Sequence, residues 1–299
     1  MERLKVFGLM ALLSVLLVGL GGYVGGNAGA AGFFILSLAT NAFMYWNSHK
    51  LVLRQYKARI IEPGAEGGEY DELYTMVDRL RQRAALPMPT VAISAQSQPN
   101  AFATGRDAKH AVVCVTQGMW DAVKRGYMGM DELEGVMAHE LAHVKNHHML
   151  VGTIAASMAG AVMLVGSILR WGAIFGGFGG RDRREGSGLE MIALAILAPI
   201  AAMIVQMAIS RRNEFVADAD GARISGKPLS LAHALQKIEG IAKEHPMQVA
   251  PSVAPLAIIN PLGALGGFAT LFRTHPLTED RVARLQELAA REDLAALTR

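Results

Sequence analysis

The chain has 299 residues, of which 52% are hydrophobic and only 18% charged, and its mean hydropathy is +0.26. This composition is too apolar for an ordinary soluble domain and indicates membrane segments. The formal net charge is +3, and no basic tract with interleaved aromatic residues is present, so nothing indicates nucleic-acid binding. The single cysteine, Cys114, excludes an internal disulfide framework and a cysteine-rich zinc module.

Two charge-free stretches near the start of the chain are long enough to cross a bilayer as helices. They cover residues 6–24 and 30–46, and about 20 apolar residues span the hydrocarbon core. Basic residues flank both outer ends, whereas the turn at residues 25–29 carries no charge. The positive-inside rule therefore predicts a hairpin, residues 1–48, with both ends in the cytoplasm. A cleaved signal peptide is the alternative for the first stretch, but the second stretch leaves no room for a mature amino terminus.

A second pair of apolar stretches lies in the middle of the chain, at residues 149–169 and 191–209. The connection between them is rich in glycine and then basic over residues 181–184, which the positive-inside rule disfavours outside the cytoplasm. Either a short basic loop is translocated, or the two stretches form a partly inserted hairpin. Both arrangements return the chain to the cytoplasm. The predicted cytoplasmic domain is therefore split into residues 49–148 and 210–299.

The polar parts carry both helical and strand patterns. Amphipathic periodicity predicts helices over residues 70–85, 230–243 and 277–290, and short apolar runs between turn residues predict strands over residues 90–94, 100–104 and 110–115. Asp131 is the predicted N-cap of a further helix, with Glu134 three residues later as in a capping box. The predicted fold class is mainly α with a small β-sheet, together with transmembrane helices.

Residues 139–143 read His-Glu-Leu-Ala-His, the H-E-x-x-H pattern. Residues four apart lie on the same face of a helix, so His139 and His143 point at one spot while Glu140 leans towards it. Neutral imidazole suits zinc, and a carboxylate that is not a ligand can take a proton from a water that zinc activates. The pattern therefore predicts a catalytic zinc site. We expect this helix to continue straight into the apolar stretch that begins at residue 149, close to the bilayer surface.

A catalytic zinc ion normally has three protein ligands and one open position, so the pattern needs one more ligand. Glu214 is the candidate, because it follows the fourth apolar stretch and so emerges from the same membrane face. Asp218, one turn later, could accept the second ring N–H of a zinc-binding histidine. Spacing alone leaves ordinary roles equally open: Glu214 as an ion-pair partner of Arg211, and Asp218 as a solvated helix acid.

Several features together resemble the M48 family of membrane zinc metalloproteases, and its bacterial heat-shock branch in particular, over nearly the whole chain. They are the H-E-L-A-H motif, the hydrophobic segments, the run from Glu214 to Asp218, and Thr274-His275-Pro276. The resemblance implies an α+β domain of the zincin type and one bound zinc ion per chain. It implies that the zinc ligands are His139, His143 and Glu214. Glu140 would be the general base and Asp218 the supporting aspartate.

The resemblance implies further site residues. The family's active-site edge strand, whose backbone would bind an extended substrate by β-augmentation, is matched by Asn100, Ala101, Phe102 and Ala103. His275 matches a histidine thought to stabilise the oxyanion, and Arg281 falls where an accompanying arginine is expected near the substrate. By contrast, His147 and His148 are interpreted as polar contacts at the membrane interface, not as metal ligands.

The implied activity is membrane-bound, zinc-dependent hydrolysis of peptide bonds in misfolded or damaged membrane proteins, as part of a stress response. The implied location is the bacterial inner membrane, with several spans and the catalytic domain in the cytoplasm. Polypeptide substrates, the lipid bilayer and other membrane quality-control proteases are the implied partners. Two alternatives stay open: a protease for prenylated peptides, and a non-proteolytic scaffold in which zinc is structural. The scaffold would need a fourth protein ligand, and none is obvious.

Overall fold

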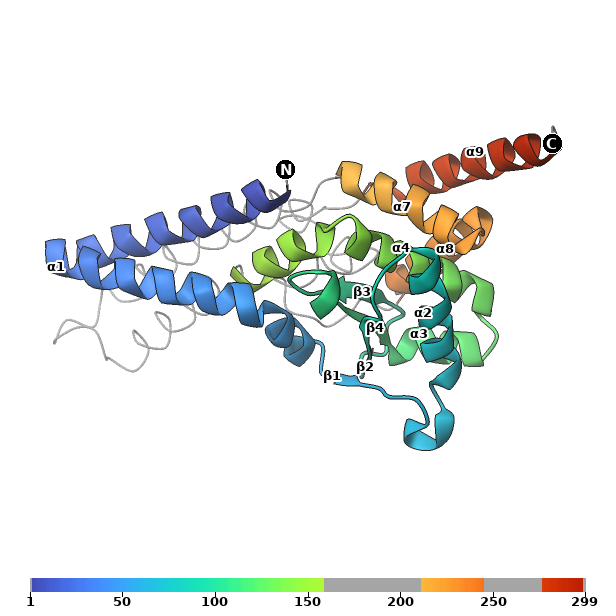
Figure 1. Cartoon of the computed structure of the whole chain (residues 1–299), viewed down its shortest axis with the longest axis horizontal. Helices are drawn as coiled ribbons and strands as arrows, with labels where there is room; N and C mark the ends of the chain where they lie inside the picture. Colours follow the sequence, from blue (N-terminus) through green and yellow to red (C-terminus); the bar gives the residue numbers. More distant parts are fainter. Residues whose placement is uncertain (1, 159–210, 245–275, 298–299) are drawn as a thin grey trace.

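The computed structural model describes residues 2–158, 211–244 and 276–297. It is mostly helical with one small mixed sheet, as predicted. A long helical hairpin projects away from a body of helices packed around the sheet (Figure 1). The predicted apolar stretch 191–209, most of the stretch 149–169, and His275 lie outside the described residues.

The hairpin is formed by α1, Glu2–Gln55, which folds back on itself at Gly25 and Gly26. Gly26 has a φ of 57°, a conformation that glycine adopts without strain. The two arms are joined by the Asn41 side chain, whose Nδ2 donates to the carbonyl of Met10 at 3.1 Å and to Oγ of Ser14 at 2.9 Å. These bonds fix the two arms in antiparallel contact.

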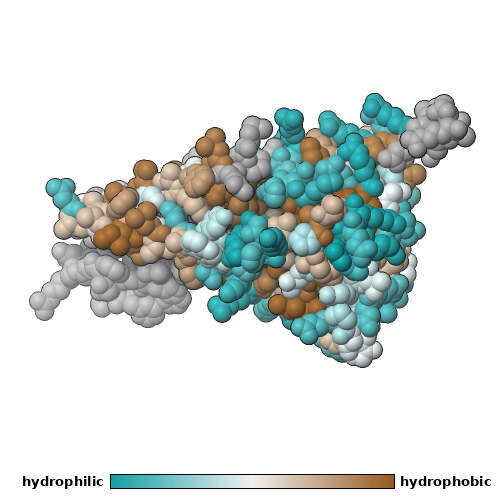
Figure 2. Space-filling model, viewed as in Figure 1, coloured by the Kyte–Doolittle hydropathy of each residue, from teal (hydrophilic) through white to brown (hydrophobic). Residues whose placement is uncertain are grey.

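The surface of α1 is apolar where it leaves the body (Figure 2). Phe7 is 67% exposed, Ile35 68% and Leu38 53%, which is unfavourable in water and favourable in lipid. Within the described residues, the arm Gly25–Gln55 is long and apolar enough to cross a membrane, and Leu4–Gly19 is a shorter apolar helix. The hairpin is therefore the part of the described chain that suits a bilayer.

The sheet contains β1 (Ala58–Ile60), β2 (Thr90–Ser94), β3 (Ala101–Thr104) and β4 (Val112–Thr116). Its strand order is β1-β2-β4-β3, with β2 and β4 parallel and both outer pairs antiparallel. The three predicted strands are confirmed within one or two residues at their ends. The sequence did not indicate β1, which is only three residues long. The order leaves β3 at an edge of the sheet.

The helices pack around the sheet and around one another, with α4 in contact with α2, α7, α8 and β3. Their bounds are α2 Asp71–Arg83, α3 Gln117–Lys124, α4 Met130–Lys145, α7 Arg211–Ser225, α8 Pro228–Glu244 and α9 Thr278–Leu297, with short 3-10 turns at Ala65–Gly68 and Ala108–His110. The main core is built from their fully buried side chains, among them Leu73, Trp120, Met137, Leu141 and Leu235. The predicted helices are confirmed, and α3 is an addition.

The predicted start of α4 is wrong by two residues. The helix begins at Met130, and the carboxylate of Glu132 accepts the backbone N–H of Gly129 at 2.7 Å, so Gly129 is the N-cap. The predicted cap, Asp131, instead accepts a hydrogen bond from Nζ of Lys227 at 2.6 Å. The side chain of Asp131, which local sequence assigned to capping, therefore pairs with a lysine that is distant in the sequence.

The predicted straight continuation of α4 is also wrong. The helix ends at Lys145, and His147 adopts a left-handed conformation with a φ of 59°. A separate apolar helix, His148–Met158, begins directly afterwards. Its residues Val151, Ile154 and Met158 pack with the first arm of α1. The metal-binding motif and the apolar segment are thus two helices joined by a sharp turn.

Candidate active site

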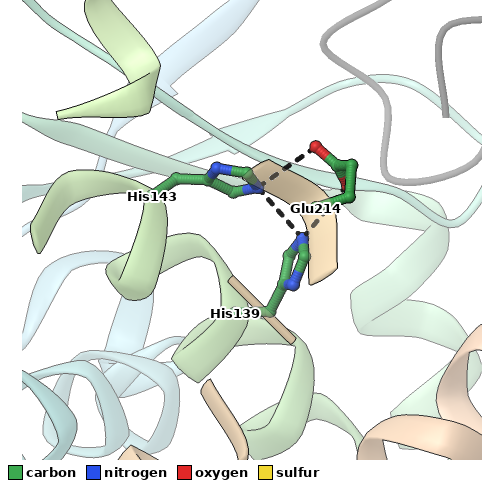
Figure 3. Close-up of side chains that lie close together, drawn as sticks. All are labelled: His139, His143 and Glu214. Carbon is green, nitrogen blue, oxygen red and sulfur yellow. Dashed lines mark hydrogen bonds and ion pairs between the residues drawn. The ribbon is translucent and has the colours of Figure 1, made fainter. Parts of the chain in front are cut away.

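Three side chains from two helices converge on one point (Figure 3). Nε2 of His143 lies 3.1 Å from Nε2 of His139 and 3.5 Å from Oε1 of Glu214. The ligand atoms of His139, His143 and Glu214 all lie within 4.8 Å of one another. The side chains are 1%, 15% and 6% exposed, respectively, so one imidazole retains access to the outside. Two imidazoles and one carboxylate match the donor set of a catalytic zinc site, so these residues fit a divalent metal.

Glu214 reaches this point because α7 packs along α4. Glu214, Asp218 and Gly221 are spaced i, i+4 and i+7 and are all buried on one face of α7. That face lies against the turn of α4 that carries His139. The predicted third ligand is therefore brought to the two histidines by helix packing.

Asp218 lies behind His139. Its Oδ1 is 2.9 Å from Nδ1 of His139, so the carboxylate accepts this ring N–H and leaves Nε2 free to bind a metal. Burial disfavours the charged imidazolium, but the hydrogen bond and negative charge of Asp218 outweigh it and raise the pKa of His139. The carboxylate thus increases the basicity of the ligand while fixing its tautomer.

Arg281 of α9 holds Asp218 in place. Its Nε and Nη2 donate to the two carboxylate oxygens at 2.8 and 2.7 Å, and its side chain is 1% exposed. Burial opposes ionisation of Asp218, but the charge and hydrogen bonds of Arg281 lower the pKa of Asp218 to about 2. Nη1 of Arg281 also lies 3.8 Å from Glu214. The resemblance assigned Arg281 to substrate binding. In this structure its guanidinium group is buried and contacts Asp218 and Glu214.

Glu140, the residue after the first histidine, is 5% exposed and points towards the edge strand β3. Burial raises the pKa of Glu140 to about 7; His139 opposes the rise, Glu214 adds to it, and the backbone N–H of Ala103 opposes it by hydrogen bonding. A carboxyl group with a pKa near neutrality is suited to accept and return a proton. Glu140 is thus a buried carboxyl group, next to the converging side chains, whose pKa suits proton transfer.

Of the four predicted edge-strand residues, Ala103 lies beside this carboxyl group, because its backbone N–H is bonded to Glu140. Asn100 is 1% exposed, donates its N–H to Oγ1 of Thr116 at 2.8 Å and accepts the N–H of Thr116 at 2.9 Å. Phe102 turns its ring away from the site, with its centroid 4.3 Å from that of Tyr56. Ala101 and Ala103 alternate with these residues, so their backbone groups point away from β4, and the backbone N–H of Ala103 is bonded to Glu140.

Sequence reasoning missed one residue of this site. Nδ1 of His148 lies 3.2 Å from Nδ1 of His143, and the two rings meet edge to face with centroids 5.3 Å apart. The interpretation of His148 as an interfacial polar residue therefore overlooked its contact with His143. The five-residue spacing concealed it, because residues i and i+5 lie on different faces of a continuous helix.

Comparison with known proteins shows the family of the chain. Residues 69–289 match the family model described as peptidase family M48. A protein named Protease HtpX homolog from Gemmatimonas aurantiaca is 54% identical over 97% of this chain and 100% of its own length. Proteins of the same name from Thermococcus kodakarensis and Desulfatibacillum aliphaticivorans are 51% and 48% identical, over 94% and 95% of this chain and 94% and 89% of their own lengths.

Among solved structures, the chain is similar to S. mikatae Ste24p, with 19% identity and a TM-score of 0.43. The match covers 84% of this chain and 57% of that chain. The matches at high identity confirm the family resemblance drawn from the motifs and set aside the non-proteolytic scaffold. The chain belongs to peptidase family M48 and is a membrane-bound metalloprotease.

Proposed function

We propose that the metal is zinc and that the protein is an endopeptidase which removes misfolded or damaged membrane proteins at the cytoplasmic face of the bacterial inner membrane. The observation that carries this proposal is the pair of imidazoles and one carboxylate, with the buried Glu140 beside them and not among them. Hard cations such as Mg²⁺ and Ca²⁺ prefer all-oxygen sites, whereas zinc binds nitrogen and oxygen together.

The residues of this chain have distinct roles in peptide hydrolysis. Bound at His139, His143 and Glu214, zinc would supply Lewis acidity and lower the pKa of water at its open position. Glu140 would accept a proton from the attacking water through its carboxylate and later return it to the leaving amine. Asp218 holds the proton on Nδ1 of His139, and Arg281 keeps Asp218 ionised. The assignment of His275 to the oxyanion rests on the family resemblance.

The substrate would bind as an extended strand along β3. Three features support this: β3 is the last strand of the described sheet, the backbone groups of Ala101 and Ala103 point away from β4, and the backbone N–H of Ala103 is bonded to Glu140. A peptide paired with this edge would bring one of its carbonyl groups close to the metal ligands. Asn100 and Phe102 would hold β3 in position through their contacts with Thr116 and Tyr56. Arg281 would act on the substrate only through Asp218 and Glu214.

The membrane arrangement remains that of the sequence analysis. The proposed units are a hairpin of residues 1–48, the first catalytic part 49–148, a second hairpin 149–209 and the second catalytic part 210–299. The apolar surface of α1 and the contact of residues 151–158 with its first arm support it. A catalytic body anchored at two places would meet substrates that are themselves in or near the bilayer. Membrane proteins and other quality-control proteases are the proposed partners.

Metal identity tests the first half of the proposal. The protein is purified in detergent with a chelator, and Zn²⁺, Mg²⁺, Mn²⁺ or Ca²⁺ is added back to the wild type and to Glu214→Gln. Cleavage of unfolded casein and of a prenylated peptide is then measured. We expect about one zinc per wild-type chain, casein cleavage with zinc, and loss of both in Glu214→Gln. Full activity of Glu214→Gln would contradict the ligand assignment, and cleavage of only the prenylated peptide would redirect the substrate assignment.

The orientation of the chain in the membrane tests the second half of the proposal, the cytoplasmic location of the catalytic part. Cys114 is fully buried, so a cysteine introduced on the surface would be the reactive thiol. Asn27→Cys lies in the exposed turn of α1, and Arg125→Cys lies at an exposed position after α3. In inverted membrane vesicles, a membrane-impermeant maleimide should label Arg125→Cys and leave Asn27→Cys unlabelled, and intact spheroplasts should give the reverse. The opposite pattern would place the catalytic body outside the cytoplasm.

A further inference from the structure

The two histidines of the metal site differ in what supports them. Nδ1 of His139 is held by the carboxylate of Asp218 at 2.9 Å, which Arg281 in turn fixes. Nδ1 of His143 instead faces Nδ1 of His148 at 3.2 Å, while its Nε2 faces the other ligand atoms at 3.1 and 3.5 Å. A histidine that binds metal through Nε2 carries its proton on Nδ1 and donates it to a neighbouring acceptor.

We propose that His148 is the positioning residue of His143: its neutral imidazole accepts the Nδ1–H of His143 through Nδ1, fixing the tautomer and orientation of that ligand. This inference rests on the proposed zinc site. For the bond to form, His148 must carry its own proton on Nε2, because an imidazole nitrogen that bears a proton cannot accept. The contact that His148 makes with the site is with Nδ1 and the ring of His143, so its proposed effect on the metal is exerted through His143.

The break after α4 is what brings the two rings together. On a continuous helix, residues five apart point about 140° away from each other, so His143 and His148 would not meet. Here α4 ends at Lys145, and His147 takes the left-handed position that closes a helix, with its N–H bonded to the carbonyl of Val144 at 3.2 Å. The next helix then starts at His148 with a new direction.

The turn at residues 146–147 is held by contacts with other elements of the fold. Nδ2 of Asn146 donates to Oδ2 of Asp220 on α7 at 2.8 Å, which ties the turn to the helix that supplies Glu214. On its other side, His148 begins the helix whose residues Val151 and Ile154 pack with the first arm of α1. His148 is therefore presented by a segment anchored at both ends. The same segment connects the metal ligand to the membrane-facing hairpin.

Zinc affinity of the purified full-length chain tests the proposal, measured by competition with a chromophoric chelator. His148→Phe keeps an aromatic ring but removes the acceptor, and we expect its zinc dissociation constant to rise about 10- to 100-fold. His148→Asn restores an acceptor at the position of Nδ1, and we expect most of the affinity to return. His147→Asn is the matched control, because His147 is exposed and asparagine tolerates its left-handed conformation.

The thermal unfolding temperature of the metal-free variants separates positioning from folding. A positioning role predicts that His148→Phe and His147→Asn unfold at nearly the same temperature without metal and differ only in zinc binding. Equal zinc affinity of wild type and His148→Phe would overturn the inference, as would equal losses in His148→Phe and His148→Asn. Failure of the wild type itself to bind zinc would instead overturn the proposed function.

Discussion

Gly221 of α7 lies directly against the backbone of His139 on α4. A Cβ atom at Gly221 would come within 2.8 Å of both Cα and N of His139, a separation that real Cβ atoms do not tolerate. Glu214 and Asp218 lie on the same face of α7, so the close approach sets how far their carboxylates reach towards the histidines. The absence of a side chain at Gly221 thus allows α7 to approach α4 closely enough for Glu214 to lie beside the two histidines.

Gly221→Ala should weaken metal binding and destabilise the fold. Alanine normally stabilises a helix interior relative to glycine by about 0.5–1 kcal/mol, but the overlap with His139 should cost about 1–3 kcal/mol and push α7 outwards. Gly240→Ala is the control, because no atom of the described residues lies within 4 Å of its Cβ position on α8. Zinc titration and thermal unfolding of both variants check this. A Gly221→Ala protein as stable and as tight in zinc binding as Gly240→Ala would show that the contact is unimportant.

Replacing Arg281 by methionine should be strongly destabilising. The change leaves Asp218 buried, ionised and without its bidentate partner, and breaking a buried ion pair in this way costs about 3–5 kcal/mol. The control is Arg291→Met on the same helix, whose side chain is 75% exposed and pairs with Glu287, and which should cost at most about 1 kcal/mol. Chemical unfolding in detergent measures both. Similar losses of unfolding free energy for the two variants would mean that the buried ion pair stabilises the fold no more than the exposed one.

Stability should fall at acidic pH through Glu134, a residue of α4 outside the candidate ligand set. Burial opposes ionisation of this carboxyl group, but hydrogen bonds from Lys227 at 2.6 Å and Arg79 at 2.9 Å outweigh it and lower the pKa of Glu134. The stabilisation is therefore fully present above the unfolded-state pKa of about 4.3. It is lost as pH falls through the lower pKa of the folded state.

The difference in unfolding free energy between wild type and Glu134→Gln isolates this effect. It should be largest at neutral pH and shrink towards zero below pH about 4. Glu287→Gln, on an exposed ion pair, should differ little from wild type at any pH. A difference for Glu134 that is constant with pH, or that grows on acidification, would contradict the assigned ion-pair network.

The features that sequence predicted depend on local spacing. His139 and His143 are one helical turn apart, so their convergence follows from helix geometry alone. The three longer strands and the amphipathic helices follow equally from periodicity. Glu214 was a candidate third ligand from its place after the fourth apolar stretch, but spacing alone left an ordinary ion pair equally open, because its approach depends on the packing of α7 against α4.

The features that sequence missed depend on distant contacts. Asp131 lost its predicted capping role because Lys227 lies beside it in the folded chain. The helix was expected to continue through His147, because no glycine or proline near this residue indicates a break. The left-handed turn at His147 is instead held by the hydrogen bond from Asn146 to Asp220. That unforeseen turn is also why the contact between His148 and His143 could not be predicted.

The central claim, metal-dependent peptide hydrolysis with Glu140 as the base, is tested most directly by Glu140→Gln. Wild type and variant are purified side by side in detergent with chelator present, loaded with zinc, and assayed for zinc content and for cleavage of unfolded casein. Because Glu140 is not among the ligands, we expect about one zinc in each protein and cleavage by the wild type alone. Zinc-dependent cleavage by a contaminant-free Glu140→Gln preparation at the wild-type rate would contradict the account.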